Sequence, residues 1–305
     1  MAAVRLVAAV LVAALICVQC GSQSPTGPSG PGPDPGPGPI VPPTPVPSGP
    51  QILVGAGDIA QCGGSSEGTA RLLDGIGGTV FAAGDLAYFQ GSRQNFQDCY
   101  NPTWGRHRGR TRPVPGNHEY ETPGAAGYFE YFGASAGPSG LGYYSYDVGA
   151  WHVIAINSNI PVDTSSFQGL WLQSDLAASR SRCTIAYSHH PLFASGPNGN
   201  QGMMRDFWRL LYNAGADVVL GGHDHLYERF APQDPDGRPD PARGIREFVV
   251  GTGGANLYQP VGVQPNSEIR ISAFGVLKLT LDTDSYEYEF VPVSGARDSG
   301  RGTCH

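Results

Sequence analysis

The chain has little positive charge to offer a polyanion, because its 305 residues include a single lysine, Lys278. Acidic residues outnumber lysine and arginine by 26 to 19, so the formal net charge at pH 7 is −7. Proteins that bind nucleic acids use clustered positive charge to neutralise phosphates. The composition therefore argues against a DNA- or RNA-binding role.

Cysteines with the Cys-x-x-Cys spacing of a zinc site are missing after residue 50. The four cysteines in this part of the chain are Cys62, Cys99, Cys183 and Cys304. An even number in an exported protein is typical of two disulfides, and four cysteines allow three pairings. We favour Cys62–Cys99 and Cys183–Cys304, which would brace the early loops and hold the C-terminal end.

After residue 20 the chain also lacks any apolar run long enough to span a membrane. Residues 1–20 are predicted to be an export signal, because Arg5 precedes an apolar stretch over residues 6–18. Cys20 is a candidate lipid attachment site, although Gln19 departs from the residue preferred before a lipidated cysteine. A retained membrane anchor is the alternative. We expect an exported protein that is extracellular or attached to the cell surface.

Residues 21–50 are rich in proline and glycine and poor in large apolar residues. Such a segment cannot bury a core and is predicted to be a disordered linker. Residues 51–295 are predicted to form the folded domain, and residues 296–305 a C-terminal tail.

Within the predicted domain, short apolar runs with strand character alternate with segments of helical spacing. Strands are predicted at 51–56, 79–83, 112–114, 143–148, 151–156, 183–187, 217–220, 247–250, 273–281 and 286–292. Helices are predicted at 66–73, with Ser66 as N-cap, and at 125–132, 168–179 and 203–212. This order predicts an α/β core with mixed sheets.

Five of the apolar runs end in short segments rich in side chains that bind metals. The segments are Gly57-Asp58, Gly84-Asp85-Leu86-Ala87-Tyr88, Gly116-Asn117-His118-Glu119, Ser188-His189-His190-Pro191 and Gly222-His223-Asp224-His225. Five of the eight histidines lie in them. Because an α/β sheet presents its ligand-binding loops where strands end, we expect the five segments to share one site.

The residue types in these segments suit a pair of metal ions. Hard cations prefer oxygen ligands and borderline cations accept imidazole. Asp85 can bridge two ions, because a carboxylate has two oxygens. Tyr88 binds well only to a strong Lewis acid such as ferric iron, because a phenol ordinarily titrates near pH ~10. His223 and His225 would point the same way on an extended loop, because its side-chain period is two.

Each segment alone has an ordinary explanation. A single Gly-Asp is a common turn, and most lone histidines are surface or core residues. His107, His152 and His305 lie outside the five segments and are assigned to that class. The joint occurrence of the five segments is what favours a metal site over five unrelated turns.

Together the five segments resemble the motifs of the calcineurin-like metallophosphoesterases, namely GD, GDxxY, GNH(D/E), a histidine two residues before proline, and GHxH. Tyr88, together with Ala60 where many members of the superfamily have histidine, is similar to the purple acid phosphatase-like subgroup, here in a bacterial, exported form. The resemblance covers roughly residues 52–290. It implies that residues 51–295 are a catalytic domain with a four-layer αββα sandwich of two facing mixed β-sheets.

The resemblance also implies two metal ions and a role for each residue. A ferric ion would be bound by Asp58, Asp85, Tyr88 and His225. A divalent ion (Zn, Mn or Fe(II)) would be bound by Asp85, Asn117, His189 and His223. His118 would face the leaving group, and His190 would contact the phosphate.

Hydrolysis of a small phosphate monoester is the reaction that we expect from this centre. Phosphodiester or nucleotide hydrolysis at the same centre is the first alternative. A non-catalytic, metal-stabilised binding module at the cell surface is the second. A binding module has no need of a leaving-group acid, so His118 favours the enzyme.

Overall fold

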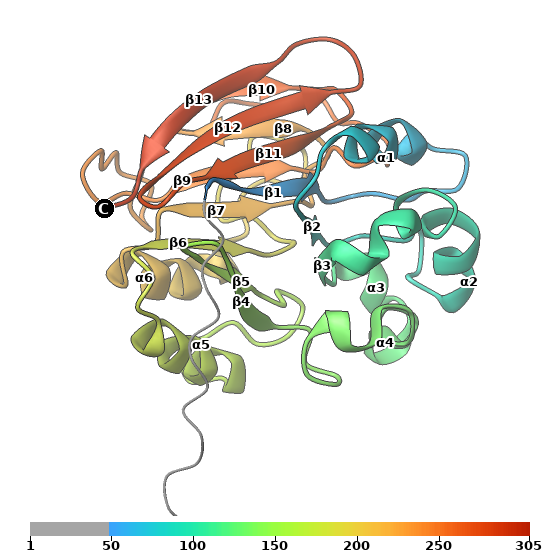
Figure 1. Ribbon diagram of the computed structural model, residues 1–305, viewed down its shortest axis with the longest axis horizontal. Coiled ribbons are helices and arrows are strands. Elements are labelled where there is room, and N and C mark those ends of the chain that lie inside the picture. The colour runs from blue at the N-terminus through green and yellow to red at the C-terminus, as the bar shows by residue number, and fades with distance from the viewer. Residues whose placement is uncertain (1–48) are drawn as a thin grey trace, which may run out of the picture. The chain divides into compact units, whose positions relative to one another are not determined.

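The protein is described here over residues 49–305 of a computed structural model, and these residues belong to one compact unit. The predicted export signal, the candidate lipid site Cys20 and nearly all of the predicted linker lie outside the described residues. Two β-sheets make up the centre of the fold (Figure 1). No helix within residues 49–305 has the length and apolarity needed to cross a bilayer.

The first sheet has six strands in the order β13-β12-β11-β1-β2-β3. They are β1 (Gln51–Ala56), β2 (Thr79–Ala83), β3 (Thr111–Val114), β11 (Gly275–Leu281), β12 (Ser285–Pro292) and β13 (Asp298–Thr303). Strands β1, β2 and β3 are parallel to one another, whereas β11, β12 and β13 each pair antiparallel with their neighbours. The carboxyl ends of the three parallel strands therefore share one edge.

The second sheet has seven strands in the order β10-β8-β9-β7-β6-β5-β4. They are β4 (Tyr144–Val148), β5 (Trp151–Ala155), β6 (Cys183–Tyr187), β7 (Val218–Gly221), β8 (Tyr227–Phe230), β9 (Arg246–Val250) and β10 (Ser267–Ile271). Strands β5, β6, β7 and β9 are parallel, and β4, β8 and β10 are antiparallel to their neighbours. Both sheets are mixed, as predicted.

The two sheets face each other across an aromatic core. Tyr227 of the second sheet stacks on Phe290 of the first, with ring centroids 4.3 Å apart. Phe248 of the second sheet meets Tyr288 of the first edge to face, with ring centroids 5.2 Å apart. Such pairs bury large apolar surfaces and add roughly 1 kcal/mol each beyond the area that they remove from water. The facing side chains therefore hold the sheets together.

Helices lie outside the sheets. They are α1 (Ser66–Gly75), α2 (Arg93–Asn95), α3 (Asn117–Tyr120), α4 (Ala126–Phe132), α5 (Phe167–Ala178) and α6 (Arg205–Asn213). Short 3₁₀ and π turns are at Phe96–Tyr100, Trp104–Arg110, Pro123–Ala125, Gly133–Ala136 and Gly202–Met204. Helices α5 and α6 cover the outer face of the second sheet, and α1 packs against β11 of the first (Figure 1). The predicted α/β architecture is confirmed.

Alternation along β5 shows why the second sheet needs a layer on each face. Val153 belongs to the core between the sheets, whereas its neighbour Ile154 packs into the cluster that contains Leu172 of α5 and Trp208 of α6. Successive strand residues point to opposite faces. Strand β5, whose five residues are all buried, is therefore covered on both sides.

The favoured disulfides, Cys62–Cys99 and Cys183–Cys304, are both confirmed. The N-cap of α1 is Ser65 rather than the predicted Ser66. Three strands were not predicted: β8, β10 and β13.

Strand β13 occupies most of the segment that the sequence analysis assigns to a C-terminal tail. Its sequence lacks apolar side chains, but Gly300 and Gly302 pair with Tyr288 and Tyr286 of β12. A Cβ at Gly300 would lie 2.3 Å from the Tyr288 hydroxyl. The tyrosine rings thus cover the glycines, and this edge strand needs no apolar residues of its own.

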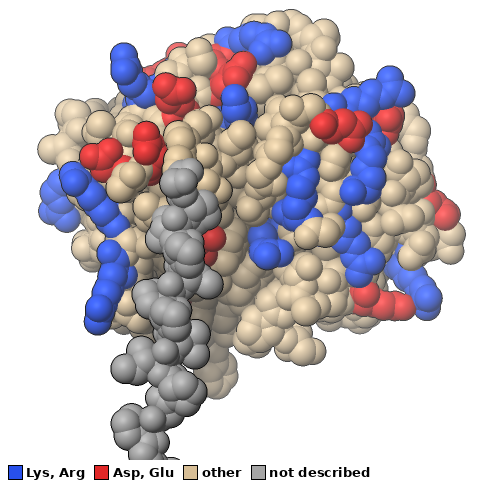
Figure 2. Space-filling model, in the orientation of Figure 1, with Lys and Arg blue, Asp and Glu red and all other residues tan. Residues whose placement is uncertain are grey.

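Figure 2 shows several arginine side chains on the side of the molecule where α1 and α2 lie, with acidic side chains among them. Arg106 pairs with Glu67 and Asp74, and Arg93 pairs with Glu130. These pairs are partly or largely exposed, so each contributes little to stability. They do, however, neutralise part of the positive charge on this face.

Candidate metal centre

The seven predicted ligands meet where five parallel strands end. Asp58 follows β1, Asp85 and Tyr88 follow β2, and Asn117 begins α3 just after β3. His189 follows β6, and His223 and His225 follow β7. Each strand delivers its side chain to the same place because the carboxyl ends of parallel strands lie at one edge. The two sheets thus contribute to one site.

One cluster of donor atoms forms around the Tyr88 hydroxyl. This oxygen lies 2.9 Å from Asp58 Oδ1, 3.3 Å from Asp85 Oδ2 and 3.2 Å from His225 Nε2. His225 Nε2 is in turn 3.1 Å from Asp58 Oδ1. Four atoms that can bind a metal, from three segments of the chain, are therefore grouped together.

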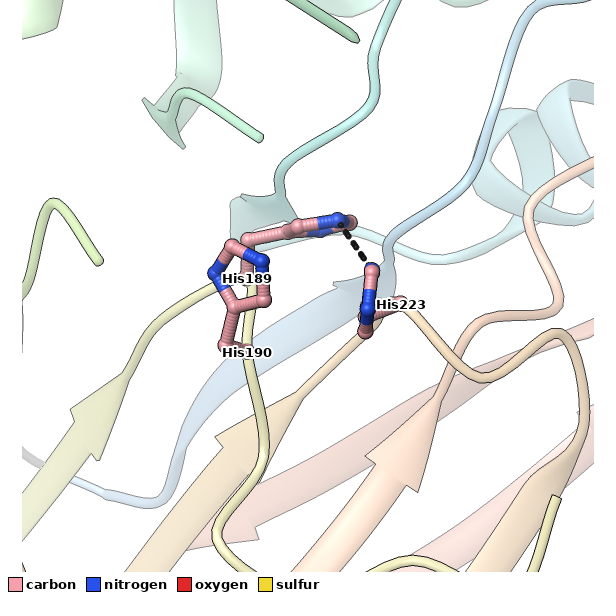
Figure 3. A group of neighbouring side chains, drawn as sticks. All are labelled: His189, His190 and His223. Carbon is pink, nitrogen blue, oxygen red and sulfur yellow. Dashed lines mark hydrogen bonds between the residues drawn. The ribbon is translucent and has the colours of Figure 1, made fainter. Parts of the chain in front are cut away.

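A second cluster forms around His189 Nε2. This nitrogen lies 3.3 Å from Asp85 Oδ2, 3.0 Å from Asn117 Oδ1 and 3.2 Å from His223 Nδ1. Figure 3 shows the His189 and His223 rings turned toward each other, with the His190 ring beside them. Asp85 Oδ2 belongs to both clusters. The two donor sets therefore share one carboxylate oxygen.

Backbone carbonyls set the orientation of two histidine rings. His189 Nδ1 lies 2.9 Å from the Ala83 carbonyl oxygen, and His225 Nδ1 lies 2.6 Å from that of Asn256. A carbonyl oxygen only accepts, so each Nδ1 carries a hydrogen and each Nε2 is directed at its cluster. This is the arrangement that a metal-binding histidine requires.

In each aspartate a backbone amide holds one carboxylate oxygen, and the other oxygen faces the donor clusters. The amide of His223 donates to Asp58 Oδ2 at 2.8 Å, and the amide of His118 donates to Asp85 Oδ1 at 2.9 Å. Asp58 and Asp85 have φ angles of 58° and 51°, in the left-handed region. Non-glycine residues seldom adopt this conformation, and such positions concentrate at functional sites.

Burial and charge within the centre act in opposite directions on Asp85. Burial favours the neutral carboxyl, but the neighbouring His189 outweighs it and lowers the pKa of Asp85. Burial and then the charges of Asp58 and Asp85 raise the pKa of Tyr88 well above its usual value. Only a strongly charged cation would therefore convert Tyr88 to a phenolate at neutral pH.

The donor set fits a pair of metal ions. It combines two buried carboxylates, a phenol, an amide oxygen and three imidazoles, each within about 3.3 Å of another donor. Without cations, the two carboxylates would be buried close together at a cost of several kcal/mol. Hard and borderline ions are the species that such a set accommodates.

The two predicted catalytic histidines lie at the rim of the donor clusters. His118 Nε2 is 3.8 Å from Asp85 Oδ2, and the His118 side chain is 28% exposed. Its Nδ1 is hydrogen-bonded to the carbonyl of Phe89. His190 Nδ1 is 2.8 Å from the Ser158 hydroxyl, and burial lowers the pKa of His190 to about 2. His190 is therefore a neutral imidazole here.

The three remaining histidines lie outside the centre, as expected. His152 is placed between Asp147 and Asp175, and His107 Nε2 lies 3.1 Å from the carbonyl of Ala70. His305 pairs with Asp217. Each has a local partner that accounts for its position.

Sequence reasoning missed the residues that support the centre. Ser158 follows the end of β5, so the rule that polar residues follow parallel strands would have found it. Asn256 acts through a backbone carbonyl, which leaves no signal in the sequence. Glu119 has no role that its motif predicts, although it is fully buried and accepts three backbone hydrogen bonds.

Comparisons with known proteins agree with the motifs. A sequence model described as calcineurin-like phosphoesterase matches residues 45–227. Purple acid phosphatase 21 of Arabidopsis thaliana is 32% identical over 254 residues, covering 72% of this chain and 54% of the plant protein. Human acid phosphatase type 7 is 27% identical over 203 residues, covering 54% of this chain and 45% of that protein. The chain spans about half the length of these curated relatives.

Solved structures show the same fold. Purple acid phosphatase PPD1 from yellow lupin (Lupinus luteus) seeds superimposes with a TM-score of 0.71 at 22% identity, over 86% of this chain and 55% of that one. GAP50, described as the anchor in the inner membrane complex of Plasmodium, gives a TM-score of 0.64 at 14% identity, over 85% and 90%. With the family match covering more than half its length, the chain belongs to the calcineurin-like phosphoesterases, in their purple acid phosphatase-like group.

Proposed function

We propose that this protein hydrolyses phosphate monoesters at a centre of two metal ions. The observation that carries the proposal is the Asp85 carboxylate oxygen shared by the two donor clusters. A single ion would not need two complete sets of donors around one bridging group. A pair of ions is the arrangement with which proteins clamp a phosphoryl group between attacking and leaving oxygens.

Each donor cluster suits a different kind of ion. The cluster of Asp58, Asp85, Tyr88 and His225 contains a phenol and two carboxylates, which suit Fe(III). The cluster of Asp85, Asn117, His189 and His223 is richer in imidazole and less charged, which suits Zn, Mn or Fe(II). Bound ions would supply Lewis acidity toward a phosphoryl oxygen and would make water a nucleophile near neutral pH.

His118 is proposed to act on the leaving group. The Phe89 carbonyl accepts from Nδ1–H, which fixes the ring and leaves Nε2 pointing toward the partly exposed side of the centre. A protonated Nε2 in this place donates a hydrogen bond, and then the proton, to the departing alkoxide. General acid catalysis of this kind typically contributes 10²- to 10⁴-fold.

His190 is proposed to bind a phosphate oxygen. The Ser158 hydroxyl accepts from the His190 amide at 3.1 Å and lies 2.8 Å from Nδ1. If the hydroxyl hydrogen points to Nδ1, the ring hydrogen is on Nε2. The neutral ring then donates one hydrogen bond and attracts the anion without adding a charge.

Two further points remain predictions. Export, with anchoring through Cys20, rests on residues outside the described part of the chain. The binding-module alternative has a structural precedent in GAP50, which shares the fold and is described as an anchor. What favours an enzyme here is the set of donor atoms together with His118, because an anchor needs neither.

The test is to assay the full chain, as purified and after metal reconstitution, on a chromogenic phosphate monoester and on the matching bis-ester. We expect metal-dependent hydrolysis with a higher kcat/KM for the monoester. A higher kcat/KM for the bis-ester would establish the phosphodiesterase alternative. Protein that holds two metals per chain but hydrolyses neither ester would contradict catalysis and support the binding module.

A further inference from the structure

Glu119 is a buried carboxylate with no role in either donor cluster. It is the third residue of α3, directly after Asn117 and His118, and its exposed fraction is 0%. Its Oε1 accepts from the amides of Leu86 at 2.8 Å and Ala87 at 3.2 Å. Its Oε2 accepts from the amide of Gly116 at 2.7 Å. Both oxygens of the side chain are therefore occupied by backbone donors.

The three amides belong to the two segments that carry most of the centre. Leu86 and Ala87 lie between Asp85 and Tyr88, and Gly116 directly precedes Asn117. Glu119 thus connects the loop that follows β2 to the start of α3. No other side chain in residues 49–305 is hydrogen-bonded to both segments through their backbone amides.

The two segments are packed too closely to slide past each other. A Cβ at Gly116 would lie 2.1 Å from Asp85 Oδ1, and a Cβ at Gly91 would lie 2.4 Å from the Glu119 Cα. Both glycines allow a close approach that any other residue would prevent. Hydrogen bonds across this contact therefore set a definite distance between the segments.

We propose that Glu119 is a positioning residue that fixes the β2 loop, with Asp85 and Tyr88, relative to Asn117 and His118. The importance of this position for catalysis rests on the proposed function, whereas the link between the two segments does not. In effect Glu119 presets the distance from the shared carboxylate of Asp85 to Asn117 of the second cluster and to the leaving-group histidine, His118. Preorganisation of this kind is what a site needs to bind ions without first rearranging.

A carboxylate is required because the segments supply donors on both sides. A glutamine has the same size but only one acceptor oxygen, and its amide group carries two hydrogens. In Glu119→Gln that amide must face either the Gly116 amide or those of Leu86 and Ala87. Two donors cannot hydrogen-bond to each other, so one half of the link is lost at constant volume.

Asp217 provides a matched control. It is a buried carboxylate that accepts from the amides of Thr184 at 2.8 Å and His305 at 3.0 Å. It lies beside the start of β6, whereas His189 follows the end of that strand. Asp217→Asn makes the same chemical change at a place that contacts no donor atom of the centre.

The experiment compares wild type, Glu119→Gln and Asp217→Asn as metal-free and metal-loaded full chains. Hydrogen exchange of the metal-free proteins, read by mass spectrometry, tests the link directly. We expect faster exchange at 86–87 or at 116 in Glu119→Gln, and at 184 or 305 in Asp217→Asn. Unchanged exchange in all three amides of Glu119→Gln would overturn the inference.

Metal-loaded protein tests the consequence. Glu119→Gln should bind metal roughly 10- to 100-fold more weakly than wild type, which is usual when residues that orient the ligands are changed. The visible absorption band expected from a ferric ion bound to Tyr88 should also shift. Asp217→Asn should lower the melting temperature and leave metal affinity and spectrum unchanged. If both variants lose only stability, Glu119 is structural and not positioning. If wild type binds no metal, the proposed function fails, and the exchange data alone decide on Glu119.

Discussion

Two histidine–carboxylate clusters occupy opposite ends of neighbouring parallel strands. At the beginning of β5, His152 lies between Asp147 and Asp175. Beyond the end of β6, His189 lies beside Asp85. Both histidines are buried and both lie beside carboxylates, yet only the second cluster has the features of a metal centre.

The difference lies in the second nitrogen of each ring. His152 Nδ1 is 3.2 Å from Asp147 and its Nε2 is 2.8 Å from Asp175, so carboxylates occupy both nitrogens. His189 gives one nitrogen to the Ala83 carbonyl and turns the other toward the donor cluster. A buried histidine near carboxylates is thus a ligand candidate when one ring nitrogen is left to face further metal-binding atoms, as in His189.

Removal of the shared carboxylate should have the largest effect on the metal centre. Asp85→Ala deletes the oxygen that belongs to both donor clusters. We expect loss of both metals and of nearly all phosphatase activity, measured by elemental analysis and by kcat/KM. Retention of both metals in this variant would show that Asp85 is no bridge.

Replacement of His118 should separate catalysis from metal binding. His118→Ala leaves every donor atom of the two clusters in place, because His118 lies at their rim. We expect turnover to fall by roughly a hundredfold or more with metal content unchanged, the usual scale for losing a general acid. A variant with normal turnover would contradict the assignment of a leaving-group role.

Tyr88→Phe tests the proposal that its cluster binds ferric iron, and its effect should be smaller than that of the two changes above. The change removes only the hydroxyl that lies against Asp58, Asp85 and His225 and keeps the buried ring, so the fold should be retained. We expect the visible charge-transfer band of a ferric phenolate to disappear, measured by absorption spectroscopy. The same band in wild type and variant would exclude Tyr88 as a ligand.

His152→Ala should leave activity and metal content unchanged and affect stability alone. Burial disfavours the charged ring, but Asp175 and Asp147 outweigh it and raise the pKa of His152. A raised pKa stabilises the folded state fully below the ordinary value of about 6.5, and this contribution is lost as the pH rises through the folded-state pKa. The variant should therefore be destabilised by about 1–3 kcal/mol near pH ~6 and less near pH ~9. Denaturant unfolding that shows equal destabilisation at the two pH values would contradict this pH dependence.

Sequence was sufficient for the features that depend on local pattern. Strands such as β1 and β6 are apolar runs that end in motif residues, and their period and endings predict both the strand and the loop. The convergence of the seven predicted ligands follows from the same rule. The geometry of each cluster does not, because the separation of two strand ends depends on packing between sheets that no single segment encodes.

The features that sequence did not predict depend on tertiary partners. Strand β13 exists because β12 supplies tyrosine rings over its glycines. Strand β8 is only four residues long and follows the last motif directly, so its pairing with β9 and β10 defines it. The carbonyls of Ala83 and Asn256 orient two ligand rings, but any residue can supply a carbonyl.

Asp85 is proposed to join two donor sets for metal ions, whereas the cluster around His152 is expected to bind no metal. The most direct test is the metal content of the full chain, measured by elemental analysis for wild type and for His152→Ala. We expect two ions per chain in both proteins. One ion or none in fully reconstituted wild type would show that Asp85 bridges no pair of ions, and a metal lost in His152→Ala would show that the His152 cluster binds metal.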